Sequence, residues 1–197
     1  LAKDAGFPDG VFNIITGSAK EIGMELTKNP KIKKISFTGS TEVGKILMEQ
    51  SASTVKKISM ELGGHAPFIV FDDADIDEAV AGALQSKFRN SGQTCICTNR
   101  IFVHESVYDI FLEKFTHEVK KIKVGNGLDE GIVSGPLIDK SSLEKVIDHV
   151  QDAVNVGAKI VVGGEVHPLG GNFYQPTVLS NVSTEAKITF EETFGPV

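Results

Sequence analysis

Short apolar runs alternate with longer amphipathic segments along most of this chain of 197 residues. Each short run favours a β-strand and each longer segment a helix, and strands that alternate with helices are typical of mostly parallel sheets. The pattern therefore predicts an α/β fold. The expected strands are 11–15, 32–37, 55–62, 67–71, 100–104 and 159–162, and the expected helices are 18–29, 41–52, 72–90, 105–121 and 139–156.

The net charge of the chain argues against some classes of binding partner. Twenty Lys and Arg against 26 Asp and Glu leave a net charge of −6, which argues against nucleic acid or an anionic membrane surface as the main partner. No apolar run approaches the roughly 18 residues that a membrane span needs. The two cysteines lie one residue apart and cannot build a disulfide scaffold, so we expect a reducing, cytoplasmic location.

Paired glycines mark the expected domain boundary. A break at Gly63-Gly64 predicts two domains, 1–62 and 63–197. The chain begins at Leu1 without an initiator Met and stops at Val197, where an apolar run is starting. Natural termini tend to be polar and frayed, so these ends predict an excised piece of a longer polypeptide.

Cys95 is the candidate nucleophile. It follows the small and hydrogen-bonding residues 91–94 on an expected loop, where a thiol can be both reachable and ionised. The alternative is that a free cysteine is only a small buried hydrophobe. A zinc site fails on ligand count, so no metal site is expected. The neighbouring Cys97 could form a reversible disulfide that switches Cys95 off, and we treat this as a hypothesis.

Three further segments carry polar groups that could do chemistry. Glu61 ends an apolar strand, where desolvation would raise its pKa and suit it to act as a general base; a salt-bridge partner at a strand end is the equal alternative. Residues 39–44 form a strand–glycine–helix turn that aims N–H groups at an anion, although plain turns look similar. Residues 191–196, taken alone, favour a turn with solvated charges.

The order of these motifs is more specific than any one of them. The sequence FTGSTEVG at 37–44, MELGG at 60–64, GQTC at 92–95 and EETFGP at 191–196 resembles the aldehyde dehydrogenase superfamily across essentially the whole chain. Within it, GGHAPFIVF at 63–71 and KFRNSGQTCIC at 87–97 are similar to the succinate-semialdehyde dehydrogenases. The resemblance implies that 1–62 is the end of a Rossmann-type cofactor domain and that 63–197 is most of a catalytic domain.

The resemblance also implies roles for single residues. Cys95 would attack the aldehyde carbon as a thiolate, its backbone N–H would donate to the oxyanion, and Glu61 would activate the water that hydrolyses the resulting thioester. Ser40 would meet the cofactor pyrophosphate, while Glu192 would hold the nicotinamide-side ribose. The implied cofactor-binding residues are Thr38, Gly39, Ser40, Leu62, Glu192 and Phe194, with Thr38 and the Leu62 carbonyl near the nicotinamide and Phe194 packing close by.

Arg89 is the one residue that indicates which substrate is bound. By resemblance its guanidinium would pair with the distal carboxylate of succinate semialdehyde; the alternative is a helix-end Arg that bonds local carbonyls. Glutarate semialdehyde and general aldehydes stay open as substrates. NAD is favoured weakly over NADP, and the whole protein is expected to be a homo-oligomer. For the isolated chain we expect a catalytically inactive α/β module, because the family's upstream oxyanion Asn and adenosine-binding Lys do not precede Leu1.

Overall fold

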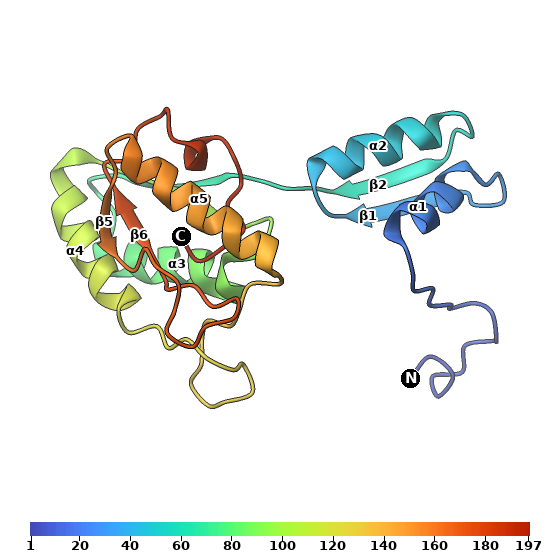
Figure 1. Ribbon diagram of the computed structural model, residues 1–197, viewed down its shortest axis with the longest axis horizontal. Coiled ribbons are helices and arrows are strands. Elements are labelled where there is room, and N and C mark those ends of the chain that lie inside the picture. The colour runs from blue at the N-terminus through green and yellow to red at the C-terminus, as the bar shows by residue number, and fades with distance from the viewer. The chain divides into compact units, whose positions relative to one another are not determined.

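The computed structural model describes residues 1–197 and separates between Leu62 and Gly63 into two units, Leu1–Leu62 and Gly63–Val197. In Figure 1 the first unit runs from blue to cyan and the second from green to red. None of the helices combines the length and the apolar character that crossing a bilayer requires.

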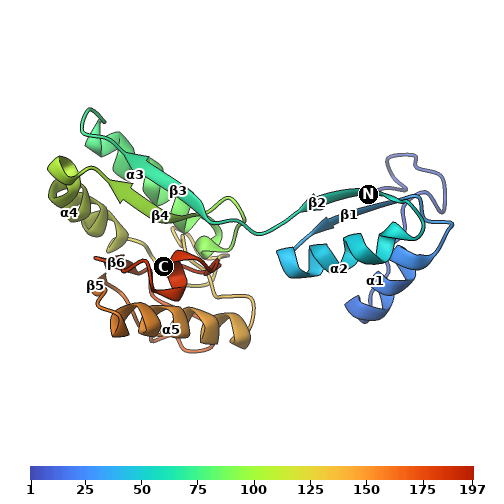
Figure 2. The ribbon, with the colours of Figure 1, turned by 90° about the horizontal axis from the view of Figure 1, so that it is seen from above.

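The first unit is a β–α–β element preceded by a helix. Its elements in chain order are α1 (Ala19–Lys28), β1 (Lys34–Thr38), α2 (Thr41–Ala52) and β2 (Lys57–Glu61). β1 and β2 pair in parallel, as the alternation predicts, with Thr38 opposite Glu61. Figure 2 shows α1 and α2 side by side on one face of this pair. Both helices begin at a serine that accepts a backbone N–H, Ser18 from Glu21 and Ser40 from Val43.

The prediction of a strand at 11–15 is wrong. Val11 and Phe12 form bends, residues 13–15 have no regular structure, and Val11 donates its N–H to Pro8 within a turn rather than to a neighbouring strand. A strand needs a ladder partner for its backbone groups, and this unit offers none to the segment. Four apolar side chains of the segment are therefore exposed, namely Val11, Phe12, Ile14 and Ile15.

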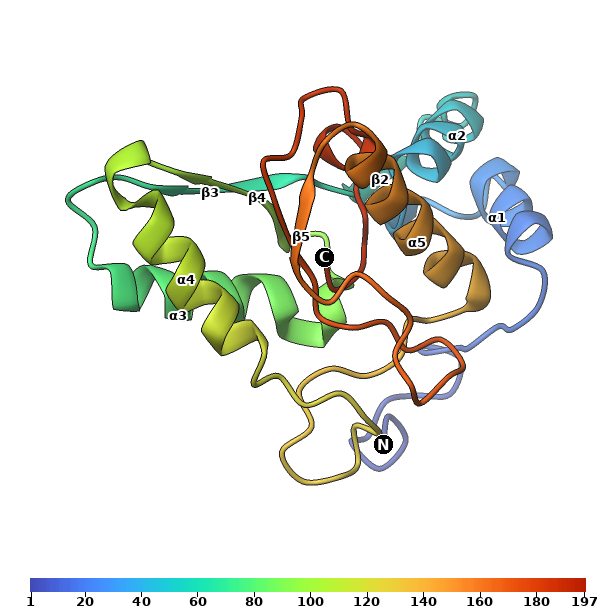
Figure 3. The same cartoon turned by 60° about the vertical axis from the view of Figure 1, so that its left-hand side comes forward.

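The second unit begins with another β–α–β element. Its elements are β3 (Ala66–Val70), α3 (Ile76–Phe88), η1 (Arg89–Gly92), β4 (Thr98–Val103), η2 (Glu105–Val107) and α4 (Tyr108–Val119). β3 and β4 are parallel, and α3 packs against both β4 and α4. Figure 3 shows α3 running below the two strands, with α4 crossing in front of it. The main core lies between these elements and includes Val70, Val80, Phe88, Phe111 and Phe115.

The rest of the second unit is built on α5 (Lys140–Asn155), β5 (Lys159–Val162), β6 (Val178–Ser180) and η3 (Lys187–Thr189). β5 and β6 are antiparallel, so the parallel arrangement holds for two of the three strand pairs. The short β6 was not expected from the sequence. The buried face of α5 packs Leu143, Val146 and Val150 against Leu137 and Tyr174.

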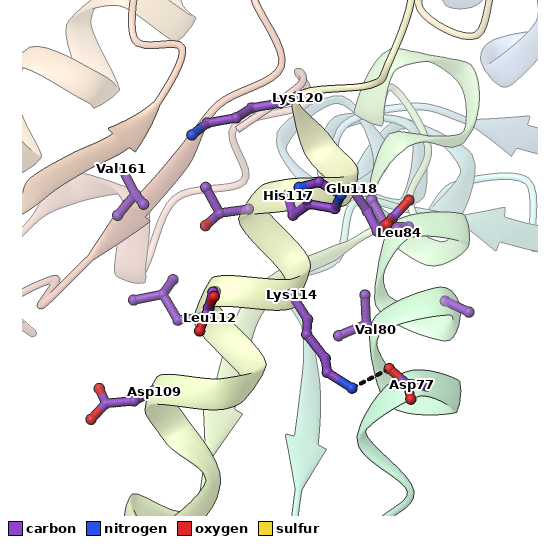
Figure 4. A pocket seen from close by; sticks show the side chains of 13 residues that line it. Asp77, Val80, Leu84, Asp109, Leu112, Lys114, His117, Glu118, Lys120 and Val161 are labelled. Carbon is purple, nitrogen blue, oxygen red and sulfur yellow. Dashed lines mark hydrogen bonds and ion pairs between the residues drawn. The ribbon is translucent and has the colours of Figure 1, made fainter.

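A hollow of about 990 Å³ lies between α3 and α4. Figure 4 shows Asp77 on α3 paired with Lys114 on α4. The carboxylate oxygen and the ammonium nitrogen of this pair lie 2.5 Å apart. None of the candidate site residues lines this hollow. Its size therefore does not mark it as the site of the chemistry.

The N-terminus of α3 provides a test of the fold. The Asp75 carboxylate accepts the backbone N–H groups of Asp77 and Glu78 at 3.0 and 3.2 Å. We expect Asp75→Ala to lower the free energy of unfolding by about 1 kcal/mol in urea titrations, because two donors at the helix end lose their acceptor. The matched control is Asp73→Ala, at an exposed position outside the helix. Equal losses in the two variants would contradict the assignment of Asp75 as the cap.

Candidate active site

The backbone between α3 and Cys95 adopts an unusual conformation. Asn90, Ser91 and Gly92 have φ of 52°, 56° and 73°, three left-handed residues in succession, of which two are not glycine. A Cβ at Gly92 would overlap the carbonyl oxygen of Gly195. The turn is therefore held by close packing, and glycine is required at 92 for both its φ and its contact.

Cys95 itself is half-buried, and both cysteines are free. A Cβ at Gly64 would lie 2.7 Å from the carbonyl oxygen of Cys95, so the second of the paired glycines allows the chain to approach the nucleophile's own backbone. The thiol is thus reachable while its peptide unit is confined on one side. This is the combination that a nucleophile on a loop requires.

Cys97 differs from Cys95 in both exposure and contacts. It is buried, and its thiol lies 3.2 Å from the Ser86 carbonyl oxygen and 2.8 Å from that of Lys87. A disulfide with Cys95 would require this thiol to leave the last turn of α3. The redox pair therefore stays a hypothesis. No three His, Cys, Asp or Glu side chains converge where they could hold a metal ion.

Lys87 is a buried cation that the sequence reasoning missed. Its ammonium donates to Asn99 Oδ1 at 2.8 Å. Burial lowers the pKa of Lys87 to about 8, and the charges of Cys97 and Glu192 oppose that shift. Helical spacing could have located it, because Lys87 falls two turns after Val80 on the face of α3 that packs into the core.

Residues 191–196 are only partly solvated: Thr193, Gly195 and Pro196 are buried, whereas Glu191 and Phe194 are exposed. Glu192 Oε1 accepts the N–H of Gly64 at 3.2 Å, and its backbone oxygen accepts Lys145 Nζ at 2.5 Å. Phe194 has a φ of 55° and is 38% exposed. The second unit thus joins segments of three sequence motifs, because Gly64 contacts Glu192 through its N–H and packs against the Cys95 carbonyl.

His149 was not expected to take part, yet it fixes the residues on both sides of Glu192. Its buried ring lies on α5, with Nδ1 3.1 Å from Thr193 Oγ1 and Nε2 3.2 Å from Glu191 Oε2. Burial lowers the pKa of His149, and the hydrogen bond to Glu191 opposes that shift in part. A lone histidine amid apolar helix positions carries little sequence signal, which explains why it was missed.

The first unit gathers its candidate residues at one edge. Thr38 and Glu61 are paired at the carboxyl ends of parallel strands, and Ser40 caps the helix that starts beside them. Gly39 donates its N–H to the Glu61 carbonyl at 3.0 Å. A helix N-terminus after a parallel strand suits a pyrophosphate, so this edge fits the phosphate part of a dinucleotide.

Glu61 departs from one expectation. Its side chain is exposed, so the strand end does not enclose the carboxylate in apolar surroundings. The reason is that β2 buries little of itself: none of its five residues is fully buried, because the two-stranded sheet has neighbours over only part of its surface. Leu62, which follows, is half-buried and packs its side chain against Gly44.

Arg89 lies at the C-terminus of α3 with an exposed side chain. The guanidinium makes no hydrogen bond to local carbonyls, so the alternative of a helix-end cap does not apply. It lines a hollow of about 470 Å³ together with Phe88, Lys121 and Val133. Cys95 is not among the lining residues, so Arg89 and Cys95 do not share this hollow.

The whole chain is similar to known proteins. The model of the aldehyde dehydrogenase family matches residues 1–197. The chain is 58% identical to succinate-semialdehyde dehydrogenase [NADP(+)] GabD of Escherichia coli and 55% identical to glutarate-semialdehyde dehydrogenase of Pseudomonas aeruginosa, covering all of this chain and 41% of each relative. The crystal structure of succinate-semialdehyde dehydrogenase from Burkholderia pseudomallei matches with a TM-score of 0.97 at 55% identity, over 99% of this chain and 40% of that one. The chain thus spans about two fifths of the length of these relatives.

The buried imidazole of His149 predicts how stability changes with pH. Its folded pKa lies below the ordinary value of 6.5, so below that pH the unfolded chain binds more protons than the folded chain. The stability that comes from the neutral ring is complete above pH 6.5 and is lost as the pH falls toward the folded pKa. In urea titrations at several pH values, we expect His149→Gln to lose less stability than the wild-type chain over this range.

The matched control for that series is His117→Gln, at an exposed position on α4. It should keep the pH dependence of the wild-type chain. If His149→Gln keeps the same dependence as His117→Gln, the buried ring of His149 does not couple folding to protons in this way.

Proposed function

Because this chain belongs to the aldehyde dehydrogenase family, we propose that the protein that carries it oxidises succinate semialdehyde to succinate with a nicotinamide dinucleotide. The observation that carries the proposal is the half-buried Cys95 thiol, which follows a turn of left-handed residues and has its own carbonyl packed against Gly64. A reducing compartment such as the cytoplasm would keep this thiol free, as both cysteines are here.

The proposed chemistry starts at sulfur. The Cys95 thiolate attacks the aldehyde carbon, a carbon–sulfur bond forms, and the oxygen takes the negative charge, which the Cys95 N–H stabilises. Hydride acceptance is the chemistry that a bound nicotinamide dinucleotide supplies. Oxidation of the carbon leaves a thioester on Cys95. Glu61 then takes a proton from the water that attacks the thioester, and the carbon–sulfur bond breaks to release the acid and the thiol.

Four groups would hold the dinucleotide. Ser40 and the start of α2 would meet the pyrophosphate, Thr38 would lie near the nicotinamide, and Glu192 would take the nicotinamide-side ribose. The capped helix end after β1 supports the first of these, and the packing of residues 191–196 supports the last. These contacts are common to NAD and NADP. The Escherichia coli relative is named for NADP(+), so both cofactors are to be assayed.

Arg89 supports an acidic substrate. Its guanidinium is exposed and free of local hydrogen bonds, and a guanidinium pairs bidentately with a carboxylate. Succinate and glutarate semialdehydes both present a distal carboxylate and differ by one methylene, which is worth only about 1–3 kcal/mol of discrimination. The two relatives compared above carry these two substrate names. Glutarate semialdehyde is therefore the second candidate.

The direct test is formation of reduced cofactor by the protein that carries this sequence, measured with both semialdehydes and with NAD and NADP. We expect the highest kcat/KM with succinate semialdehyde and complete loss in Cys95→Ala. Retention of hydride transfer in Cys95→Ala would overturn the assignment of the nucleophile. A higher kcat/KM with glutarate semialdehyde would overturn the choice of substrate and leave the reaction class intact.

Arg89 gives a sharper prediction about the substrate. Arg89→Ala should raise KM for succinate semialdehyde by about tenfold to a hundredfold and leave an uncharged aldehyde little changed, because a charged hydrogen bond is worth about 1.5–3 kcal/mol. Lys121→Met is the matched control, since Lys121 lines the same hollow but is paired with Glu118. An equal loss on both substrates, or an equal effect of the control, would count against Arg89 as the carboxylate partner.

A further inference from the structure

The side chain of Gln93, two residues before Cys95, joins the nucleophile loop to a distant segment. Its Nε2 donates to the Pro136 carbonyl at 3.2 Å, and its Oε1 accepts the N–H of Ile138 at 3.0 Å. The amide therefore contacts a carbonyl and an N–H of one segment at once, as a neighbouring backbone would. Gln93 has no part in the proposed chemistry.

Ser91 makes a second connection to the same segment. Its hydroxyl accepts the N–H of Gly135 at 2.8 Å and lies 3.2 Å from both the Gly135 carbonyl and the Ser134 hydroxyl. Ser91 is buried, whereas Gln93 is half-buried. Residues 134–138, which we call the clamp segment, thus contact the loop on both sides of Gly92.

The clamp segment is itself held by the core of the second unit. Leu137 is buried beside Val146 and Tyr174, and its N–H donates to the Asn172 carbonyl at 2.9 Å. At its other end, Ser134 donates its N–H to the Lys123 carbonyl at 3.1 Å. A segment that is anchored at both ends can hold a loop that packs against it in a fixed position.

The loop needs such an anchored neighbour because its backbone is strained. Asn90 and Ser91 both have positive φ, a conformation that persists in non-glycine residues only where the surroundings impose it. We propose that Gln93 is a positioning residue that holds Cys95 in its reactive place by tying the loop to the clamp segment. The proposal rests on the proposed function only in that Cys95 is the nucleophile.

Two readouts test the proposal separately. In the 197-residue chain, Cys97→Ala leaves Cys95 as the single thiol, and its alkylation by iodoacetamide reports how far the loop shields it. Gln93→Met keeps the length of the side chain and removes both hydrogen bonds to the clamp segment, together with a longer one of 3.5 Å to the Asn90 carbonyl. We expect it to raise the alkylation rate severalfold, because the half-buried thiol is released. In the protein that carries this sequence, we expect the same variant to lower kcat by up to about a hundredfold, as a displacement of about 1 Å does, with KM changed less than twofold.

The matched control is Gln151→Met, which removes an amide whose hydrogen bond to Asn155 lies on the surface of α5. It should leave both readouts unchanged. Gln93→Glu is a second variant of the same shape, and when ionised it can accept from Ile138 but cannot donate to Pro136. We expect it to be intermediate between the wild type and Gln93→Met, and it replaces Gln93→Met if that variant does not fold.

An alkylation rate equal to that of Gln151→Met overturns the positioning role, as does an unchanged kcat in an active enzyme. A rise in KM that matches the loss in kcat/KM overturns it too, because it would indicate a role in binding. If the wild-type protein shows no hydride transfer, the proposed function fails, and the alkylation rates alone then decide whether Gln93 positions Cys95.

Discussion

Three consecutive left-handed residues, 90–92, are the constraint on which the candidate site depends. The turn they form ends α3, exposes Arg89 and carries the chain to a half-buried Cys95. Such a backbone is costly for Asn and Ser, so it persists only because its neighbours impose it. Gly195 fills the space beside Gly92, and side chains from both sides of Gly92 bond to the clamp segment.

Close backbone approach links motifs that lie far apart in the sequence. Gly64 comes against the carbonyl of Cys95 and donates to Glu192, which places segments of three motifs around one point of the second unit. Gly92 approaches the backbone of Gly195 in the same way, whereas Gly195 itself packs against the side chain of Val146 on α5. Gly64 and Gly92 are therefore places where one backbone must pass close to another, which no larger residue permits.

The sequence predicted most elements to within a few residues. Helix 41–52 and strand 159–162 coincide with α2 and β5, because strong periodicity and clear caps define them. Strand 11–15 failed because β propensity does not provide a ladder partner, and β6 was missed because three residues carry too little pattern. Glu61 lies at the end of its strand as expected, yet its exposure depends on what covers the sheet, which local sequence cannot tell.

By itself the sequence determined the α/β class, the membership of the aldehyde dehydrogenase family and the choice of Cys95 as the candidate nucleophile. These follow from periodicity and from residue types in a fixed order, which are properties of the chain alone. Only the tertiary structure decided that Cys97 is buried, that Lys87 and His149 are enclosed, and that Gln93 reaches the clamp segment. Those facts depend on which surfaces meet, because burial and hydrogen bonding between distant residues are set by packing and not by local pattern.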